Sequence, residues 1–132
     1  MEDLVLTYGR WFTPSRLPID RPTGSLQRCF ANAARHSCEY DLFYVEGYAT
    51  ANSAAPFPHA WCSRPDGTVE DPTWNGDGTN YFGIPFTADF IRSRDLRREN
   101  GPLLFDQHLT GWQLLHGGIP DGAIAAVGQP HS

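Results

Sequence analysis

The sequence has no long apolar run, no concentration of positive charge and few cysteines. Its 132 residues include 10 lysine and arginine residues against 15 aspartate and glutamate residues, which gives a formal net charge of −5. A general nucleic-acid-binding protein needs a surplus of cations to neutralise phosphates, so this balance argues against nucleic acid as a partner. No apolar stretch reaches the roughly 20 residues that cross a bilayer, which argues against a membrane-spanning protein.

The cysteine content points to free thiols rather than to a disulfide framework. Cys29, Cys38 and Cys62 are three in number, so at least one thiol has no partner within the chain. The first residues lack the charged and then apolar pattern of a signal peptide, and we therefore expect a reducing, cytoplasmic setting. These cysteines with His36 and His59 do not have the Cys-x-x-Cys spacing of structural zinc, so we expect no metal.

The composition is that of a globular protein, with 40% apolar and 13% aromatic residues. A chain of this length predicts one domain over residues 1–132. Prolines and glycines predict an irregular lead-in over residues 1–24, and a Gly- and Pro-containing end predicts a loosely ordered tail over residues 117–132.

Hydrophobic periodicity and turn signals predict an α+β domain. Ser25 is a candidate N-cap for a helix from Leu26 to about His36, and Thr87 is a candidate N-cap for a helix over 88–99. Segments rich in aromatic and β-branched residues, or returning from a turn, predict strands: 42–50, 57–63, 68–74 and 81–86. Residues 102–116 fit a helix or a strand. We expect an antiparallel sheet packed on the helix that begins after Ser25.

Cys29 lies within the first turns of that expected helix. The N–H groups at a helix N-terminus have no intrahelical partners, and the helix dipole is positive there. Both effects favour a thiolate, which is a better nucleophile than a thiol. The alternative interpretation is a buried, inert cysteine.

His59 and Asp71 flank a strong turn signal, Pro65-Asp66-Gly67. If Ser63 pairs with Gly67 across the hairpin, His59 lies directly opposite Asp71, and a shift of one residue leaves them neighbours. Opposite residues on one face have Cβ atoms about 4.5–5.5 Å apart, which suits a carboxylate–imidazole hydrogen bond. Such a bond fixes the imidazole tautomer, so that the other ring nitrogen can accept a thiol proton.

The runs Cys29-Phe30-Ala31-Asn32-Ala33, His59-Ala60-Trp61 and Asp71-Pro72-Thr73 resemble the transglutaminase-like branch of the papain-like superfamily. The resemblance covers roughly residues 24–75. It implies a papain/transglutaminase-like fold, in which Cys29 is the nucleophile, His59 the general base and acid, and Asp71 the orienting carboxylate. The Arg-Gly-Gly lead-in of arylamine N-acetyltransferases is absent, because Leu26-Gln27-Arg28 precedes the cysteine.

The resemblance implies a cysteine-dependent acyl-transfer enzyme, a peptidase, deamidase or amide/acyl transferase, that acts on a peptide or protein amide. Such chemistry needs no cofactor. Around the triad, Gln27 and Asn32 are candidates for substrate or oxyanion contacts, and Trp61 and Trp74 for core packing or for lining the acyl pocket. The alternative is a catalytically silent binding or accessory module of phage or mobile-element biology. The substrate and the oligomeric state stay open.

Overall fold

The computed structural model describes residues 2–25, 28–51, 55–87, 89–91 and 122–130. Its helices and strands, in chain order, are α1 (Glu2–Tyr8), β1 (Arg10–Phe12), α2 (Cys29–Tyr40), β2 (Phe43–Ala51), β3 (Phe57–Ser63), β4 (Val69–Glu70), β5 (Gly78–Phe86) and β6 (Gln129–Pro130). The architecture is therefore α+β, as the sequence predicts.

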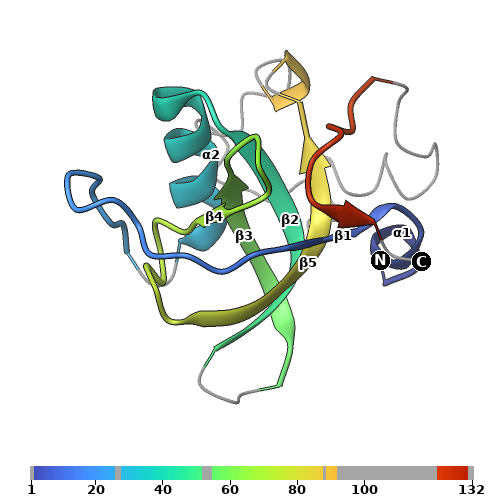
Figure 1. The fold of residues 1–132 in the computed structure, drawn as a ribbon, viewed down its shortest axis with the longest axis horizontal. Helices are drawn as coiled ribbons and strands as arrows, with labels where there is room; N and C mark the ends of the chain where they lie inside the picture. Colours follow the sequence, from blue (N-terminus) through green and yellow to red (C-terminus); the bar gives the residue numbers. More distant parts are fainter. Residues whose placement is uncertain (1, 26–27, 52–54, 88, 92–121, 131–132) are drawn as a thin grey trace.

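The strands form a single six-stranded sheet in the order β4-β3-β2-β5-β1-β6. Each of these neighbouring strands is paired antiparallel. The long strands β2, β3 and β5 form the centre, and α2 lies along the face of β2 and β3 (Figure 1). Because side chains alternate between the two faces of a strand, this arrangement gives the sheet two separate apolar layers.

The layer beneath α2 contains Ala33 and Ala34 from the helix and Tyr44, Ala60 and Cys62 from the sheet. The layer on the opposite face is built around the fully buried Trp61, with these partners: Phe12, Val45, Ala49, Val69, Tyr81, Ala125 and Val127. The consecutive residues Ala60, Trp61 and Cys62 thus contribute alternately to the two layers. This alternation decides on which face each candidate site residue lies.

The predicted helix is present, but it begins and ends later than expected. α2 covers Cys29–Tyr40, and its N-cap is Arg28 without a side-chain capping bond. The expected cap at Ser25 is wrong, because the backbone carbonyl of that residue is used instead: it accepts the Arg28 N–H at 3.1 Å and the Asn32 amide at 2.7 Å. Cys29 is therefore the first helical residue.

The strand predictions for 57–63 and 42–50 are confirmed within one residue, and the segment 81–86 lies inside β5. The strand predicted over 68–74 is wrong in length, since β4 contains Val69 and Glu70 alone. It ends because the Asp71 carboxylate accepts the backbone N–H groups of Thr73 and Trp74 and holds the chain in a turn.

Parts of the predicted irregular lead-in and loose tail have regular structure or are buried. Residues 2–8 form α1, and β1 inserts between β5 and β6. In the tail, Ala123, Ala125 and Val127 are buried, and the end of the chain pairs with β1 as β6. These short segments are ordered by strand pairing with residues far away in the sequence, which no local pattern reports.

The second predicted helix lies largely outside the described residues. Its start is present, since Thr87 accepts the Ile91 N–H at its carbonyl and the Phe90 N–H at its hydroxyl. The predictions for 92–99 and 102–116 fall outside the described part of the chain.

Candidate functional site

Cys29 lies at the edge of β3, just beyond the end of β4. Backbone N–H groups alternate between the two edges of a strand, and the Arg64 N–H donates across the hairpin toward β4. The Ala60 N–H therefore points to this same edge, but β4 ends at Glu70 before it reaches Ala60. In place of a strand, the Ala60 N–H meets the Cys29 thiol.

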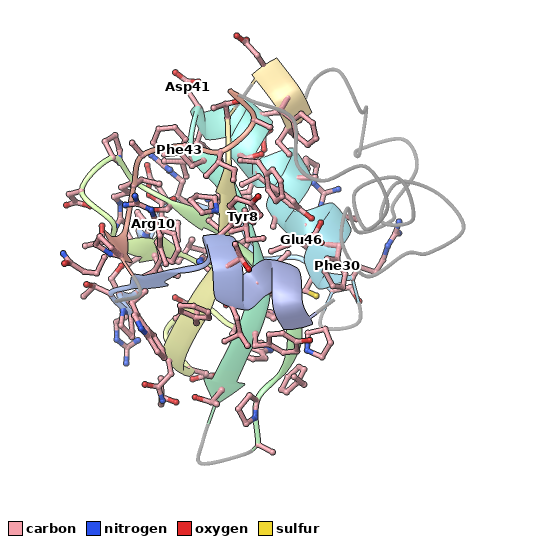
Figure 2. The ribbon with its side chains drawn as sticks, turned by 90° about the vertical axis from the view of Figure 1, so that its right-hand side faces the viewer. Tyr8, Arg10, Phe30, Asp41, Phe43 and Glu46 are labelled. Atoms are coloured by element: carbon pink, nitrogen blue, oxygen red, sulfur yellow. The ribbon has the colours of Figure 1, made fainter. Side chains whose placement is uncertain are left out.

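The electrostatics of this position favour the protonated thiol. Burial raises the pKa of the Cys29 thiol to about 11, and the nearby carboxylates of Asp71 and Glu46 act in the same direction. The Ala60 and Phe30 N–H groups lower the pKa, but by less. Figure 2 labels Phe30, in the first turn of α2, and Glu46, which comes from β2. Burial therefore opposes the effect of the helix terminus, which favours the thiolate.

His59 and Asp71 form a buried hydrogen-bonded pair. The His59 Nε2 lies 2.9 Å from Asp71 Oδ2, and both side chains are at most 1% exposed. The hairpin register differs from the expected one by two residues, since Ser63 pairs with Val69 rather than with Gly67. A shift of two preserves the face of every side chain, so Asp71 still reaches the imidazole, now from a diagonal position.

The rest of the Asp71 carboxylate is also occupied. Its Oδ1 accepts the N–H groups of Thr73 and Trp74 at 2.9 and 3.0 Å, and its Oδ2 accepts the Tyr81 hydroxyl at 2.8 Å. The Trp74 ring stacks on the His59 ring with centroids 3.8 Å apart and planes 13° apart. The carboxylate and the imidazole are therefore held in fixed orientations and shielded from water.

The arrangement leaves one ring nitrogen of His59 for proton transfer. Since Nε2 is taken by Asp71, the nitrogen that can act on a thiol is Nδ1. Among the described residues, no hydrogen bond joins the thiol to the His59 ring; the thiol contacts the Ala60 N–H of the next residue instead. Catalytic hydrogen bonds often tighten only when substrate binds.

The other predicted residues have different places. Asn32 is buried, and its amide donates to the Ser25 carbonyl at 2.7 Å and to the Thr73 hydroxyl at 2.9 Å, so it ties the start of α2 to the turn after Asp71. Trp61 is fully buried in the layer opposite α2 and packs as core. Gln27 lies outside the described residues.

The remaining cysteines have other hydrogen-bond partners or other places in the fold. Cys62 is buried in the layer beneath α2, where its thiol donates to the Ala33 carbonyl at 3.2 Å. Cys38 is free and half-buried near the end of α2. In the part of the chain that the structure describes, no group of three or more His, Cys, Asp or Glu residues is arranged to hold a metal ion.

Two residues near the site carry no signal in the motifs. Tyr81 comes from β5 and reaches Asp71 across the sheet, and only the three-dimensional pairing brings it there. Glu46 is fully buried on the face of α2, where it accepts the Tyr44 hydroxyl at 2.5 Å. On this same face a cleft of about 400 Å³ is lined by apolar and aromatic side chains: Val5, Leu6, Tyr48, Pro56 and Phe82.

Comparison with protein-family models, with curated proteins and with solved structures gave no match to this chain. No helix in the described ranges is long and apolar enough to cross a membrane.

Proposed function

We propose that this protein is a cysteine-dependent acyl-transfer enzyme of papain/transglutaminase-like fold that acts on a peptide or protein amide. The observation that carries the proposal is the position of the Cys29 thiol. It lies at the N-terminus of α2 against the N–H of Ala60, the residue that follows His59 in β3, and the His59 Nε2 is bound to the buried Asp71. A nucleophile, a base and a residue that orients the base are thus supplied by three separate elements.

The chemistry follows from the protonation states. Because the pKa of Cys29 is raised, the thiol loses its proton only as it attacks, and His59 Nδ1 accepts that proton. The sulfur forms a bond to the carbonyl carbon, and the protonated imidazole then donates its proton to the leaving amine as the C–N bond breaks. The resulting thioester on Cys29 is resolved by water or by an amine, which regenerates the thiol.

The apolar cleft supports a substrate with an apolar side chain near the reacting amide. Tyr48 and Phe82 are paired across β2 and β5, and they lie on the α2 face one row away from Glu46 and Ala60. A shift of two residues along a strand is roughly 7 Å, about the length of one side chain. A peptide whose carbonyl lies at Cys29 therefore has this cleft within reach.

The test is acylation by p-nitrophenyl acetate, with release of p-nitrophenol followed by absorbance and the modified residue located by mass spectrometry. We expect a burst and an acetyl group on Cys29, no burst from Cys29→Ser, and a rate at least about 100-fold lower from His59→Gln. Acetylation of Cys38 serves as the internal control. An equal rate in His59→Gln and in the unchanged protein would refute the mechanism.

A catalytically silent binding module is the second candidate, and the state of the thiol favours it. Burial raises the pKa of the thiol, and within the described residues no hydrogen bond joins it to the imidazole. On this alternative, Cys29 remains unacylated in a chain whose circular dichroism spectrum shows the folded state. The burst experiment therefore separates the two candidates.

A further inference from the structure

The Tyr81 hydroxyl reaches Asp71 across a gap in the side-chain layer opposite α2. Tyr81 lies on β5 and His59 on β3, with β2 between them. The β2 residues that pair with His59 and Tyr81 on this face are Gly47 and Ala49. Because one has no side chain and the other only a methyl group, the phenol can lie over β2.

The space for the phenol is also made at Gly78, the first residue of β5. A Cβ added there would lie 1.9 Å from the Tyr81 hydroxyl oxygen and 2.3 Å from the ring carbon that carries it. Contacts under 3.0 Å force a displacement, so any larger residue at this position moves the phenol. The missing side chain of Gly78 thus leaves room for this hydrogen bond.

We propose that Tyr81 is a positioning residue for the acyl-transfer site, which acts on the base through Asp71. The proposal rests on the function proposed above. The hydroxyl donates at 2.8 Å to the same oxygen, Oδ2, that accepts His59 Nε2 at 2.9 Å. It helps to hold that oxygen against the imidazole and takes part of its negative charge, so that the orientation of the base depends on the phenol as well as on Asp71.

Removal of the hydroxyl has a defined direction of effect. Asp71 then becomes a stronger acceptor for the imidazole, stabilises the imidazolium, and keeps the base protonated to higher pH. The other titratable groups facing this cluster are Cys29 and Cys62 near Asp71, Glu46 near Cys29, and Asp77 near Tyr81. None of these is altered by the substitution Tyr81→Phe.

The experiment is the pH profile of Cys29 alkylation by iodoacetamide in the full chain, followed by mass spectrometry. We expect the acid limb of the Tyr81→Phe profile to move to higher pH by about half to one pH unit, the range of one net hydrogen bond. The rate near pH 6.5 should fall several-fold. Gly78→Ala, which displaces the phenol without removing it, should shift the limb in the same direction.

Tyr40→Phe is the matched control. It also removes a phenol hydroxyl, but from the end of α2, about 16 Å along the helix from Cys29, where the ring lies under the Arg21 guanidinium. Its profile should equal that of the unchanged protein. A profile unmoved in both Tyr81→Phe and Gly78→Ala overturns the role of Tyr81, provided that His59→Gln slows alkylation. If His59→Gln has no effect either, the proposed function itself fails.

Discussion

Glu70 and Asp71 are consecutive residues, and each accepts the Nε2 atom of a buried histidine at 2.9 Å. His36 of α2 binds Glu70, and His59 of β3 binds Asp71. All four side chains are at most 3% exposed. Because neighbouring residues of an extended chain point to opposite sides, the two pairs lie on different faces of the sheet. A buried carboxylate–histidine pair thus occurs twice, at two consecutive residues of the chain.

The two pairs differ in what compensates the carboxylate. Glu70 also accepts the Arg21 guanidinium at 2.7 Å and the Arg64 guanidinium at 2.8 Å, so two permanent cations neutralise it. The described partners of Asp71 other than His59 are neutral: a phenol and two backbone N–H groups. Among its described partners Asp71 therefore has no guanidinium, whereas the Glu70 cluster uses two to join α2, β4 and the chain before α2.

From this comparison we expect first that Glu70→Gln lowers the stability of the protein more than it changes the reactivity of Cys29. Glu70→Gln leaves two guanidinium groups without their buried counter-ion, and we expect a loss of about 2–3 kcal/mol of unfolding free energy. The value lies at the low end for a buried pair because both arginines are about a quarter exposed. Urea denaturation measures it, with the exposed Glu39→Gln as control. Equal midpoints for the two variants would contradict the structural role.

We expect Asp71→Asn, in contrast, to change the reactivity of Cys29 more than the stability of the protein. The amide oxygen can still accept the two turn N–H groups, but the amide nitrogen then faces His59 and favours the tautomer with a proton on Nδ1. Such a histidine cannot accept the thiol proton. We expect acylation of Cys29 by p-nitrophenyl acetate to fall about 100-fold, with a smaller loss of stability than in Glu70→Gln. An unchanged acylation rate would remove the distinction between the two pairs.

The motifs predicted one of these pairs and not the other. Asp71 and His59 lie in runs that flank a turn signal, so the hairpin that joins them could be read from the sequence. The register was misjudged by two residues because the turn extends to Thr68, whose N–H and hydroxyl bind the Asp66 carboxylate. Glu70 and His36 are separated by 34 residues with no motif, and only the packing of α2 on the sheet brings them together.

The fold was predictable where a segment carries its own pattern. β2 is rich in aromatic and β-branched residues, β3 leads into the turn signal at Pro65-Asp66-Gly67, and the bounds of both strands agree with the prediction within one residue. β1 and β6 are strands because they pair with each other and β1 pairs with β5, although neither has more than three residues. Tyr81 cannot be identified from the sequence for the same reason, since it lies on β5 whereas its partner Asp71 follows β4, at the edge of the sheet.

The smallest expected effect is the contribution of His36 to the pH dependence of stability. Burial lowers the pKa of His36, and the nearby Arg21 acts in the same direction, while Glu70 opposes both. The unfolded chain therefore binds a proton, near the ordinary value of about 6.5, that the folded chain does not yet bind. The free energy of unfolding should thus rise with pH between the lowered pKa of His36 in the folded chain and about 6.5. On acidification through the same range it should fall.

Urea denaturation of His36→Gln at several pH values between about 5 and 7.5 tests this sign. The variant lacks the titrating group, so its stability should change less steeply with pH across that window. The glutamine side chain introduced there can still donate its amide to Glu70, which keeps the carboxylate paired. Stability that falls as pH rises through the window in the unchanged protein would mean that Glu70 dominates and holds His36 charged.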